Sequence, residues 1–240
     1  MVERHYQIDF ASGALVFPGG KLAAEDHDSA WAAFVDGADG LGDAPYRIGA
    51  IREAFEESGL LMARPRAARG AGAALIDADA LAPLLPHREA VAKGAQSFLA
   101  LVRDHDLALA LDLLTPFAHW VTPVGMPKRF DTWFYLAPTP DAQIAACDGW
   151  EAVDAVWIAP QAALAAAADG ARKIIFPTRM NLEMLAQTQS VASALAAARA
   201  RTIVCVEPKV VREDDGTLAL LIPAEAGYPV TREAFDPTTV

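Results

Sequence analysis

The sequence predicts one α/β domain over residues 1–240, with a helical insertion. Segments that look like strands alternate with helical segments along the whole chain, which is typical of a single mixed α/β domain. Hydrophobic residues make up 53% of the chain and charged residues 21%, so there is enough apolar material for a packed core. Neither an internal repeat nor a disordered linker is visible in the sequence.

The first quarter of the chain predicts a strand end, a short helix and a longer helix. The sequence Val-Phe-Pro-Gly-Gly at 16–20 has the composition of a strand that runs into a tight turn. A short helix is expected at 28–35, and a loop rich in Gly and Asp at 36–43. A longer helix is expected at 46–58, with Asp43 as its cap, Pro45 in its first turn and Gly59 at its end. Its apolar stripe comprises Ile48, Ile51, Phe55 and Ala54.

The rest of the chain predicts further helices and strands. Residues 78–110 are expected to be mainly helical, with packing residues Phe98, Leu99, Leu101 and Val102. Strands are expected at 120–123, 130–136 and 152–158, and helices at 162–168 and 181–200. A hairpin is expected over 203–222, around the turn Asp-Asp-Gly at 214–216.

Charge and composition argue against several classes of function. The formal net charge of −11, from 20 basic and 31 acidic residues, argues against a nucleic-acid or anionic-membrane binder. A small phosphorylated substrate remains compatible with this charge, because a bound metal can invert the local field. The sequence contains no run of about 18 apolar residues, which a membrane helix would need. The N-terminus lacks the basic-then-apolar order of a signal peptide.

The cysteines and the C-terminus favour a cytoplasmic protein. Cys147 and Cys205 are isolated from each other and from any His or basic cluster. Their spacing gives no disulfide framework, and their surroundings do not favour a nucleophilic role. Residues 237–240 are not a Ser-Lys-Leu type peroxisomal signal.

The most informative segment is Arg-Glu-Ala-Phe-Glu-Glu-Ser-Gly-Leu at 52–60. On a helix, Glu53, Glu56 and Glu57 lie three and four residues apart and so share one face. Like charges at these spacings repel each other unless a cation lies among them. Ligands that are all oxygen favour a hard cation such as Mg²⁺ or Mn²⁺. The alternative is a solvated acidic face, which is the usual role of a charge run.

This segment resembles the second half of the Nudix box, G-x5-E-x7-R-E-U-x-E-E-x-G-U, where U is aliphatic. Residues 52–60 match every fixed position of that half, with Ala54 at the first U. In the first half, Gly20 leads to Asp26 where the motif has Glu, and counting from Gly19 leads instead to Glu25. Between Asp26 and Arg52 lie 25 residues rather than seven, so an insertion of 18 residues (25 less 7) divides the box.

The divided box is similar to the branch of Nudix hydrolases that contains acyl-CoA diphosphatases with a long insertion. Other matches to this branch lie at 16–20, 98–108, 120–132 and 177–182. The resemblance covers most of the chain, from about residue 9 to the C-terminal hairpin. It implies a Nudix-like α/β/α sandwich with a mixed sheet, a helical insertion at 27–44 and extra helices before Trp120. Residues 2–5 would be the tail end of an N-terminal strand, part of which is expected to be absent.

The resemblance also implies the roles of the site residues. Glu53, Glu56 and Glu57 would hold Mg²⁺ or Mn²⁺, and the carbonyl of Gly20 would be a further ligand. Arg52 would orient a glutamate and would pair with Asp26 across the insertion. The general base stays open between Glu53, Glu56 and a carboxylate of a later loop.

The implied reaction is metal-dependent hydrolysis of a nucleoside diphosphate linked to another group. CoA or acyl-CoA is the expected substrate, and ADP-ribose or NADH is the enzymatic alternative. A non-catalytic nucleotide-binding Nudix module is the third possibility, and a homodimer is left open. Candidate phosphate contacts for CoA are Lys128, Arg129 and Arg179, each of which can equally be a surface cation. Trp120, Trp133 and Phe134 are expected to pack in the core, and His119 to be structural or exposed.

Overall fold

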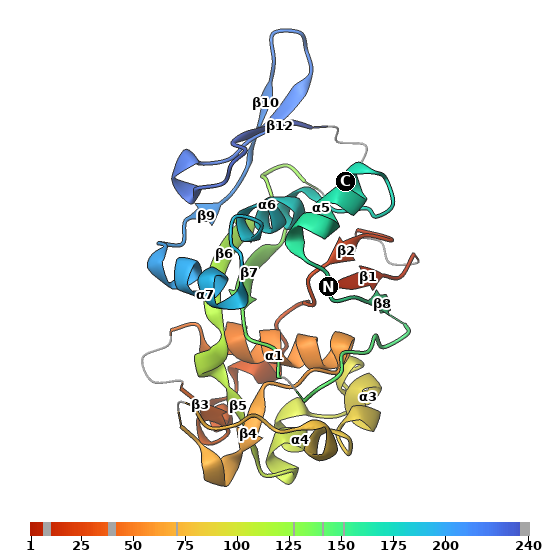
Figure 1. The fold of residues 1–240 in the computed structure, drawn as a ribbon, viewed down its shortest axis with the longest axis vertical. Helices are drawn as coiled ribbons and strands as arrows, with labels where there is room; N and C mark the ends of the chain where they lie inside the picture. The colour runs from red at the N-terminus through yellow and green to blue at the C-terminus, as the bar shows by residue number, and fades with distance from the viewer. Residues whose placement is uncertain are drawn as a thin grey trace. The chain divides into compact units, whose positions relative to one another are not determined.

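The computed structural model describes residues 1–6, 11–37, 42–70, 72–126, 128–140, 142–150 and 152–235. The chain divides into two compact units, which are described one at a time. The first comprises residues 1–6, 16–114 and 137–157, and the second comprises residues 7–15, 115–136 and 158–240. Figure 1 shows the fold and labels the helices and strands for which there is room. The prediction of a single domain stays a prediction.

The first unit contains two small sheets. In one, β1 (Val2–Arg4) pairs antiparallel with β8 (Ala152–Ala155), and β2 (Leu15–Val16), of which Val16 belongs to this unit, follows on the other side of β1. In the other, β5 (Leu107–Ala110) lies between β3 (Val35–Asp36) and β4 (Ala63–Pro65), parallel to β3 and antiparallel to β4. The sheet of β3, β5 and β4 is therefore mixed. In the other sheet, β1 and β2 confirm the two predicted strand ends at residues 2–5 and 16.

Helix α1 (Ala44–Ser58) is the longest helix of the first unit and carries the carboxylates. It begins after Asp43 and ends at Gly59, whose φ of 71° is the left-handed conformation that favours glycine. The end agrees with the prediction, whereas the start lies two residues before the predicted residue 46. Asp43 precedes the helix as predicted, but it makes no capping hydrogen bond. Its carboxylate instead accepts a bond from Nε of Arg47, at 2.8 Å.

The predicted helical region at 78–110 consists of short helices followed by a strand. The helices are α2 (Ala78–Leu81), η4 (Leu85–His87), α3 (Arg88–Ala92) and α4 (Phe98–Asp104). The prediction is wrong for residues 107–110, which form the middle strand β5. All four of these residues are buried, so they lack the alternation that identifies a half-buried strand.

The insertion is less helical than predicted. The 3₁₀ helix η1 (Ala24–His27) ends where the predicted insertion at 27–44 begins. The described part of the insertion contains the 3₁₀ helix η2 (Ser29–Ala33) and the strand β3, while residues 38–41 lie outside the described residues. Arg64 of β4 holds the end of this segment. Its buried guanidinium contacts Asp36 at 2.6 Å and Asp112 at 2.7 and 2.9 Å.

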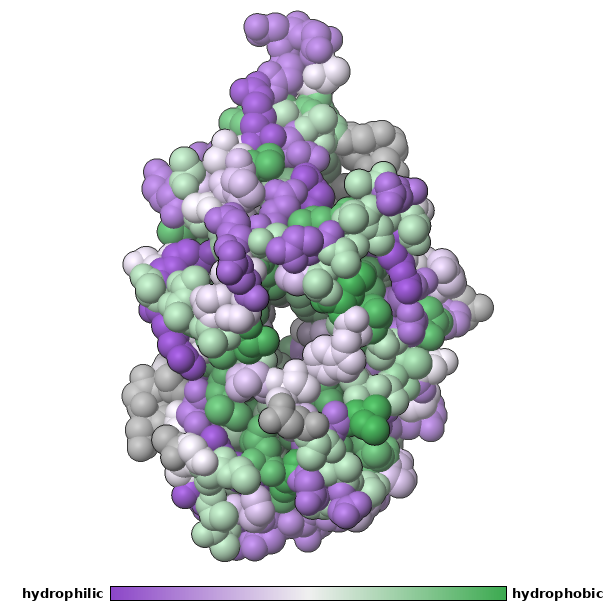
Figure 2. Space-filling view, viewed as in Figure 1, coloured by the Kyte–Doolittle hydropathy of each residue, from purple (hydrophilic) through white to green (hydrophobic). Residues whose placement is uncertain are grey.

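The second unit contains two three-stranded sheets. Strand β6 (Thr115–Val121) lies between β7 (Asp131–Leu136), to which it is antiparallel, and β9 (Cys205–Val206), to which it is parallel. The other sheet has the order β10 (Lys209–Arg212), β11 (Leu218–Leu221), β12 (Arg232–Phe235), and all its pairs are antiparallel. The predicted hairpin at 203–222 is thus partly wrong, because β9 joins β6 and β12 adds a third strand. Figure 2 shows hydrophilic side chains at the turn between β10 and β11.

The described residues of the second unit also contain three α-helices, α5 (Pro160–Ala168), α6 (Phe176–Leu185) and α7 (Val191–Ala200), and the 3₁₀ helix η6 (Ala224–Ala226). The predicted continuous helix at 181–200 is wrong, because two helices occupy that stretch. Ser190 caps α7 by accepting a bond from the backbone of Ser193, at 3.1 Å. A serine cap of this kind starts a new helix rather than continuing the old one. Among the described residues, no helix combines the length and apolar character needed to cross a membrane.

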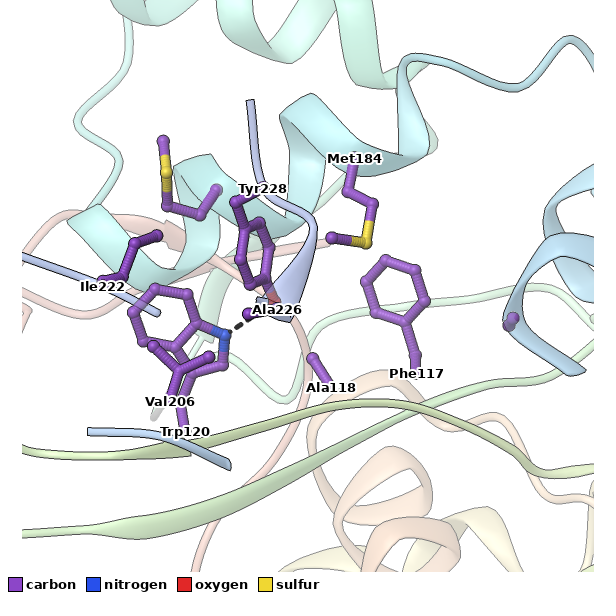
Figure 3. Packing of buried hydrophobic residues seen from close by; sticks show 10 residues of the cluster. Phe117, Ala118, Trp120, Met184, Val206, Ile222, Ala226 and Tyr228 are labelled. Carbon is purple, nitrogen blue, oxygen red and sulfur yellow. Dashed lines mark hydrogen bonds between the residues drawn. The ribbon is translucent and has the colours of Figure 1, made fainter. Parts of the chain in front are cut away.

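The core of the second unit is organised around a buried polar chain. Figure 3 shows Trp120 donating to the hydroxyl of Tyr228, at 2.9 Å, among apolar neighbours. The same hydroxyl donates to Oδ1 of Asn181, at 2.7 Å. Trp120 is therefore a core residue, as predicted.

Replacing Tyr228 with Phe is expected to destabilise the second unit by about 2 kcal/mol, because it leaves the buried indole N–H of Trp120 and Oδ1 of Asn181 without their partner. Urea unfolding monitored by tryptophan fluorescence measures the loss. Tyr6→Phe is the control, because that hydroxyl is exposed and bonds Glu3. Equal stability of the two variants would contradict a structural role for the chain Trp120–Tyr228–Asn181.

Candidate functional site

The carboxylates of helix α1 are buried. Only 9% of Glu53, 7% of Glu56 and 4% of Glu57 is exposed to solvent. The helix also buries its predicted apolar stripe, at Ile48, Ile51 and Phe55. A solvated acidic face is therefore wrong for this helix, and the energetic cost of burying three like charges needs a compensating interaction.

Arg52 supplies part of that compensation through all five of its N–H groups. Nη1 donates to Oε1 of Glu53 at 2.9 Å and to Oε1 of Glu56 at 3.0 Å. Nε and Nη2 donate to the two oxygens of Asp26 at 3.1 and 2.9 Å, and Nη2 also donates to the carbonyl of Lys21 at 2.8 Å. Burial by itself lowers the pKa of this guanidinium. The hydrogen bonds and charges of its acidic partners outweigh burial and raise the pKa above its usual value.

The bidentate pair between Arg52 and Asp26 joins the two halves of the divided motif. Asp26 is 1% exposed, and its Oδ2 also accepts a bond from the backbone of Ala23, at 2.8 Å. The predicted ion pair across the insertion is thus confirmed, and the choice between Asp26 and Glu25 is resolved.

Glu25 has a different partner in the same unit. Its carboxylate accepts bonds from the backbone N–H groups of Phe98, at 2.9 Å, and Leu99, at 3.2 Å, and from the hydroxyl of Ser97. These are the first groups of α4, where a negative charge complements the helix dipole. Adjacent acids therefore connect the loop to two different helices.

The Gly-Gly turn lies directly against the carboxylates. The backbone N–H of Gly19 donates to Oε2 of Glu57, at 3.0 Å. A Cβ atom on Gly20 would lie 2.4 Å from Oε2 of Glu53, so any side chain would force that carboxylate to move. This close approach is a physical reason for glycine at position 20. It places Gly20 against Glu53, whose carboxylate Arg52 bonds together with that of Glu56.

Gly49 marks a second close approach, which sequence reasoning missed. A Cβ atom there would lie 2.6 Å from Cδ2 of Leu22 and 3.1 Å from Oδ2 of Asp26. The absence of a side chain lets the loop at 22–26 pack against α1. A glycine inside a helix costs stability relative to alanine, so its position was the available signal.

The donor set fits a hard divalent cation. Asp26, Glu53, Glu56 and Glu57 bring four carboxylates, while Arg52 brings one positive charge to this group. All the donors are oxygens, which suits Mg²⁺ or Mn²⁺. Within the described parts of the chain, no group of three His, Cys, Asp or Glu side chains has the arrangement of ligands around one ion. The excess negative charge is the observation in favour of a cation here.

The three predicted phosphate-binding cations all belong to the second unit. Arg129 pairs with Glu207 and donates to the carbonyl of Thr122, at 3.0 Å. Arg179 pairs with Glu183 and Glu233, both at 2.7 Å. Lys128 is exposed. Their predicted role in CoA binding stays a prediction.

His119 has a partner that was not visible in the sequence. Its Nε2 lies 2.6 Å from Oδ1 of Asp131, and its ring stacks on Trp133 with a centroid distance of 4.3 Å. The pairing of β6 with β7 brings these residues together. Cys205 lies beside His119 in the register of β6 and β9, but burial and the charges of Asp131 and Glu207 raise the pKa of its thiol. A raised pKa disfavours a nucleophilic role, in agreement with the sequence.

The chain is similar to known Nudix proteins over most of its length. A model of the NUDT19 Nudix domain matches residues 38–182. The human acyl-coenzyme A diphosphatase NUDT19 is 30% identical over 203 residues, which cover 68% of this chain and 53% of that protein. The Gallus gallus protein of the same name is 30% identical over 175 residues, which cover 56% of this chain and 46% of that protein. The chain spans about half the length of these curated relatives.

The fold also matches a solved structure. The crystal structure of a NUDIX hydrolase from Alicyclobacillus acidocaldarius superposes with a TM-score of 0.63 and 26% sequence identity. The match covers 81% of this chain and 86% of that chain, which confirms the predicted Nudix-like α/β fold. Because the family model also spans more than half of the chain, the protein belongs to the NUDT19 Nudix domain family.

Proposed function

We propose that this chain is a metal-dependent Nudix diphosphatase whose site is built on Arg52, Glu53, Glu56, Glu57 and Gly20. The observation that carries the proposal is the buried cluster in which one arginine meets three carboxylates beside a glycine turn. Burying three carboxylates with one arginine costs stability when no further cation is bound. Buried charge-rich clusters of this kind are typical of functional sites.

The proposed substrate is CoA or acyl-CoA, and the products are adenosine 3′,5′-bisphosphate and (acyl) 4′-phosphopantetheine. Hydrolysis breaks one P–O bond of the diphosphate and adds the oxygen of one water to phosphorus. The names of the human and Gallus gallus relatives support this substrate over ADP-ribose and NADH. Lys128, Arg129 and Arg179 remain the proposed contacts for the phosphates of the nucleotide.

Within this reaction, the residues of the chain divide into two roles. Glu53, Glu56, Glu57 and the carbonyl of Gly20 would hold Mg²⁺ or Mn²⁺, which would supply stabilisation of negative charge on the diphosphate. Arg52 fixes the carboxylates of Glu53 and Glu56 at one oxygen each, which limits their reorganisation during the reaction. Glu53 or Glu56 accepts the proton of the attacking water, unless a carboxylate of a later loop does so.

The first test is turnover of a substrate panel with Mg²⁺ or Mn²⁺. CoA and acyl-CoA are expected to be hydrolysed faster than ADP-ribose and NADH, measured by chromatography of the products. Glu56→Gln and Glu57→Gln are each expected to lower kcat on the order of 100-fold, because each removes one charged oxygen ligand. A folded chain that hydrolyses no diphosphate would favour the non-catalytic module, and full activity in both variants would refute the assigned ligands.

The second test uses two glycines that differ in their surroundings. Gly20→Ala is expected to lower kcat by about tenfold or more, because its Cβ atom displaces the carboxylate of Glu53. Gly42→Ala is the matched control, because no atom lies within 4 Å of a Cβ atom at that position. Equal losses in the two variants, or none in either, would show that the turn does not position Glu53.

The third test replaces Arg52 with Lys. Lysine offers three donors in place of five, so at least two buried acceptors lose a bond at a cost of about 1–3 kcal/mol each. We expect lower stability in urea unfolding together with a lower kcat. A variant with unchanged stability and activity would mean that the charge alone matters, rather than the planar fork of the guanidinium.

A further inference from the structure

Arg88 forms a set of bonds at the end of helix α1 that the proposed chemistry does not yet use. It is the first residue of α3, and its guanidinium reaches the last turn of α1. Nε donates to the carbonyls of Phe55, at 2.9 Å, and Glu56, at 3.2 Å, and Nη2 donates to the carbonyl of Glu56, at 2.9 Å. Nη2 also donates to the carbonyl of Ala146, at 3.0 Å.

These bonds reach carbonyls in the last turn of α1. The last four carbonyls of a helix have no intrahelical donor, and a positive charge at that end complements the helix dipole. Gly59 donates its N–H to Phe55, and the backbone of Ala146 donates to Ser58, both at 2.9 Å. Arg88 thus connects the end of α1 to the segment around Ala146 through one planar group.

Arg88 makes only main-chain bonds in the described structure. It forms no ion pair among the described residues, although burial costs its guanidinium solvation. Burial lowers its pKa, and the charge of Asp148 partly offsets that effect. Arg88 is half-buried, and a partly desolvated cation is a more costly donor to these carbonyls than a neutral group would be.

Two different arginines bond Glu56, one at its side-chain carboxylate and the other at its main-chain carbonyl. Arg52 bonds its carboxylate at 3.0 Å, and Arg88 bonds its carbonyl at 2.9 Å. We propose that Arg88 is a positioning residue, which fixes the backbone of the last turn of α1 and thereby the carboxylates of Glu56 and Glu57 for metal binding. This inference rests on the proposed metal site and extends it to a residue of the helical region between the box and β6.

The sequence could not have identified this residue. Arg88 lies 32 positions from Glu56 and is outside the motif. Position 88 also follows a Leu-Pro-His segment that reads as an ordinary turn between short helices. The contact depends on where α3 packs against α1, which only the fold determines.

The test measures Mn²⁺ binding by calorimetry on the full chain, at a temperature well below unfolding of every variant. Arg88→Met is expected to weaken Mn²⁺ binding by about tenfold, which is typical of losing a residue that orients a metal ligand. Arg88→Lys is expected to lose between about twofold and tenfold, because it keeps the charge but not the planar fork. Arg103→Met is the control, because Arg103 is exposed and pairs with its neighbour Asp104.

The outcomes separate this inference from the proposed function. If the wild-type chain binds Mn²⁺ and Arg88→Met binds it with the same affinity, Arg88 has a purely structural role and the inference is wrong. Should Arg88→Met fail to fold, wild-type affinity in Arg88→Lys is the overturning result. A folded wild-type chain that binds no Mn²⁺ would overturn the metal site and this inference together. An equal loss in Arg103→Met would also overturn the inference.

Discussion

The first unit depends on the ion-pair cluster around Arg52. One guanidinium with five engaged N–H groups holds Asp26, Glu53 and Glu56 and the carbonyl of Lys21. Removing such a group from water is costly, and only near-complete hydrogen bonding offsets that cost. The cluster fixes the orientation of α1, the path of the glycine turn and the position of the loop at 21–26.

The two halves of the divided motif meet in the structure although the insertion separates them in the sequence. Asp26 reaches Arg52 across the intervening segment, while Glu25 bonds the start of α4. Gly20 and Gly49 let two stretches of backbone approach α1 more closely than a side chain would allow. Arg64 anchors the far end of the insertion through Asp36 and Asp112. A long insertion in a surface loop adds little closure entropy, so these contacts suffice to hold it.

Sequence reasoning succeeded where local signals dominate and failed where burial or distant contacts decide. The end of α1 was predicted from Gly59, and its start was predicted to within two residues from Asp43 and Pro45, because these signals are local. Strand β5 was missed because a fully buried strand shows no alternation. The break between α6 and α7 was missed because both flanks favour helix and only Ser190 interrupts them. The partnership of His119 with Asp131 was invisible because it needs the pairing of β6 with β7.

The sequence by itself determined the family resemblance, the helix that carries the glutamates and the demand of those glutamates for a cation. Residue spacing on a helix is sufficient for this, because side chains three and four apart always share a face. Tertiary structure alone decided that the carboxylates are buried, that Asp26 rather than Glu25 meets Arg52, and that Arg88 holds the carbonyl of Glu56. These relations join residues up to 32 positions apart, and only packing brings such residues within hydrogen-bond distance.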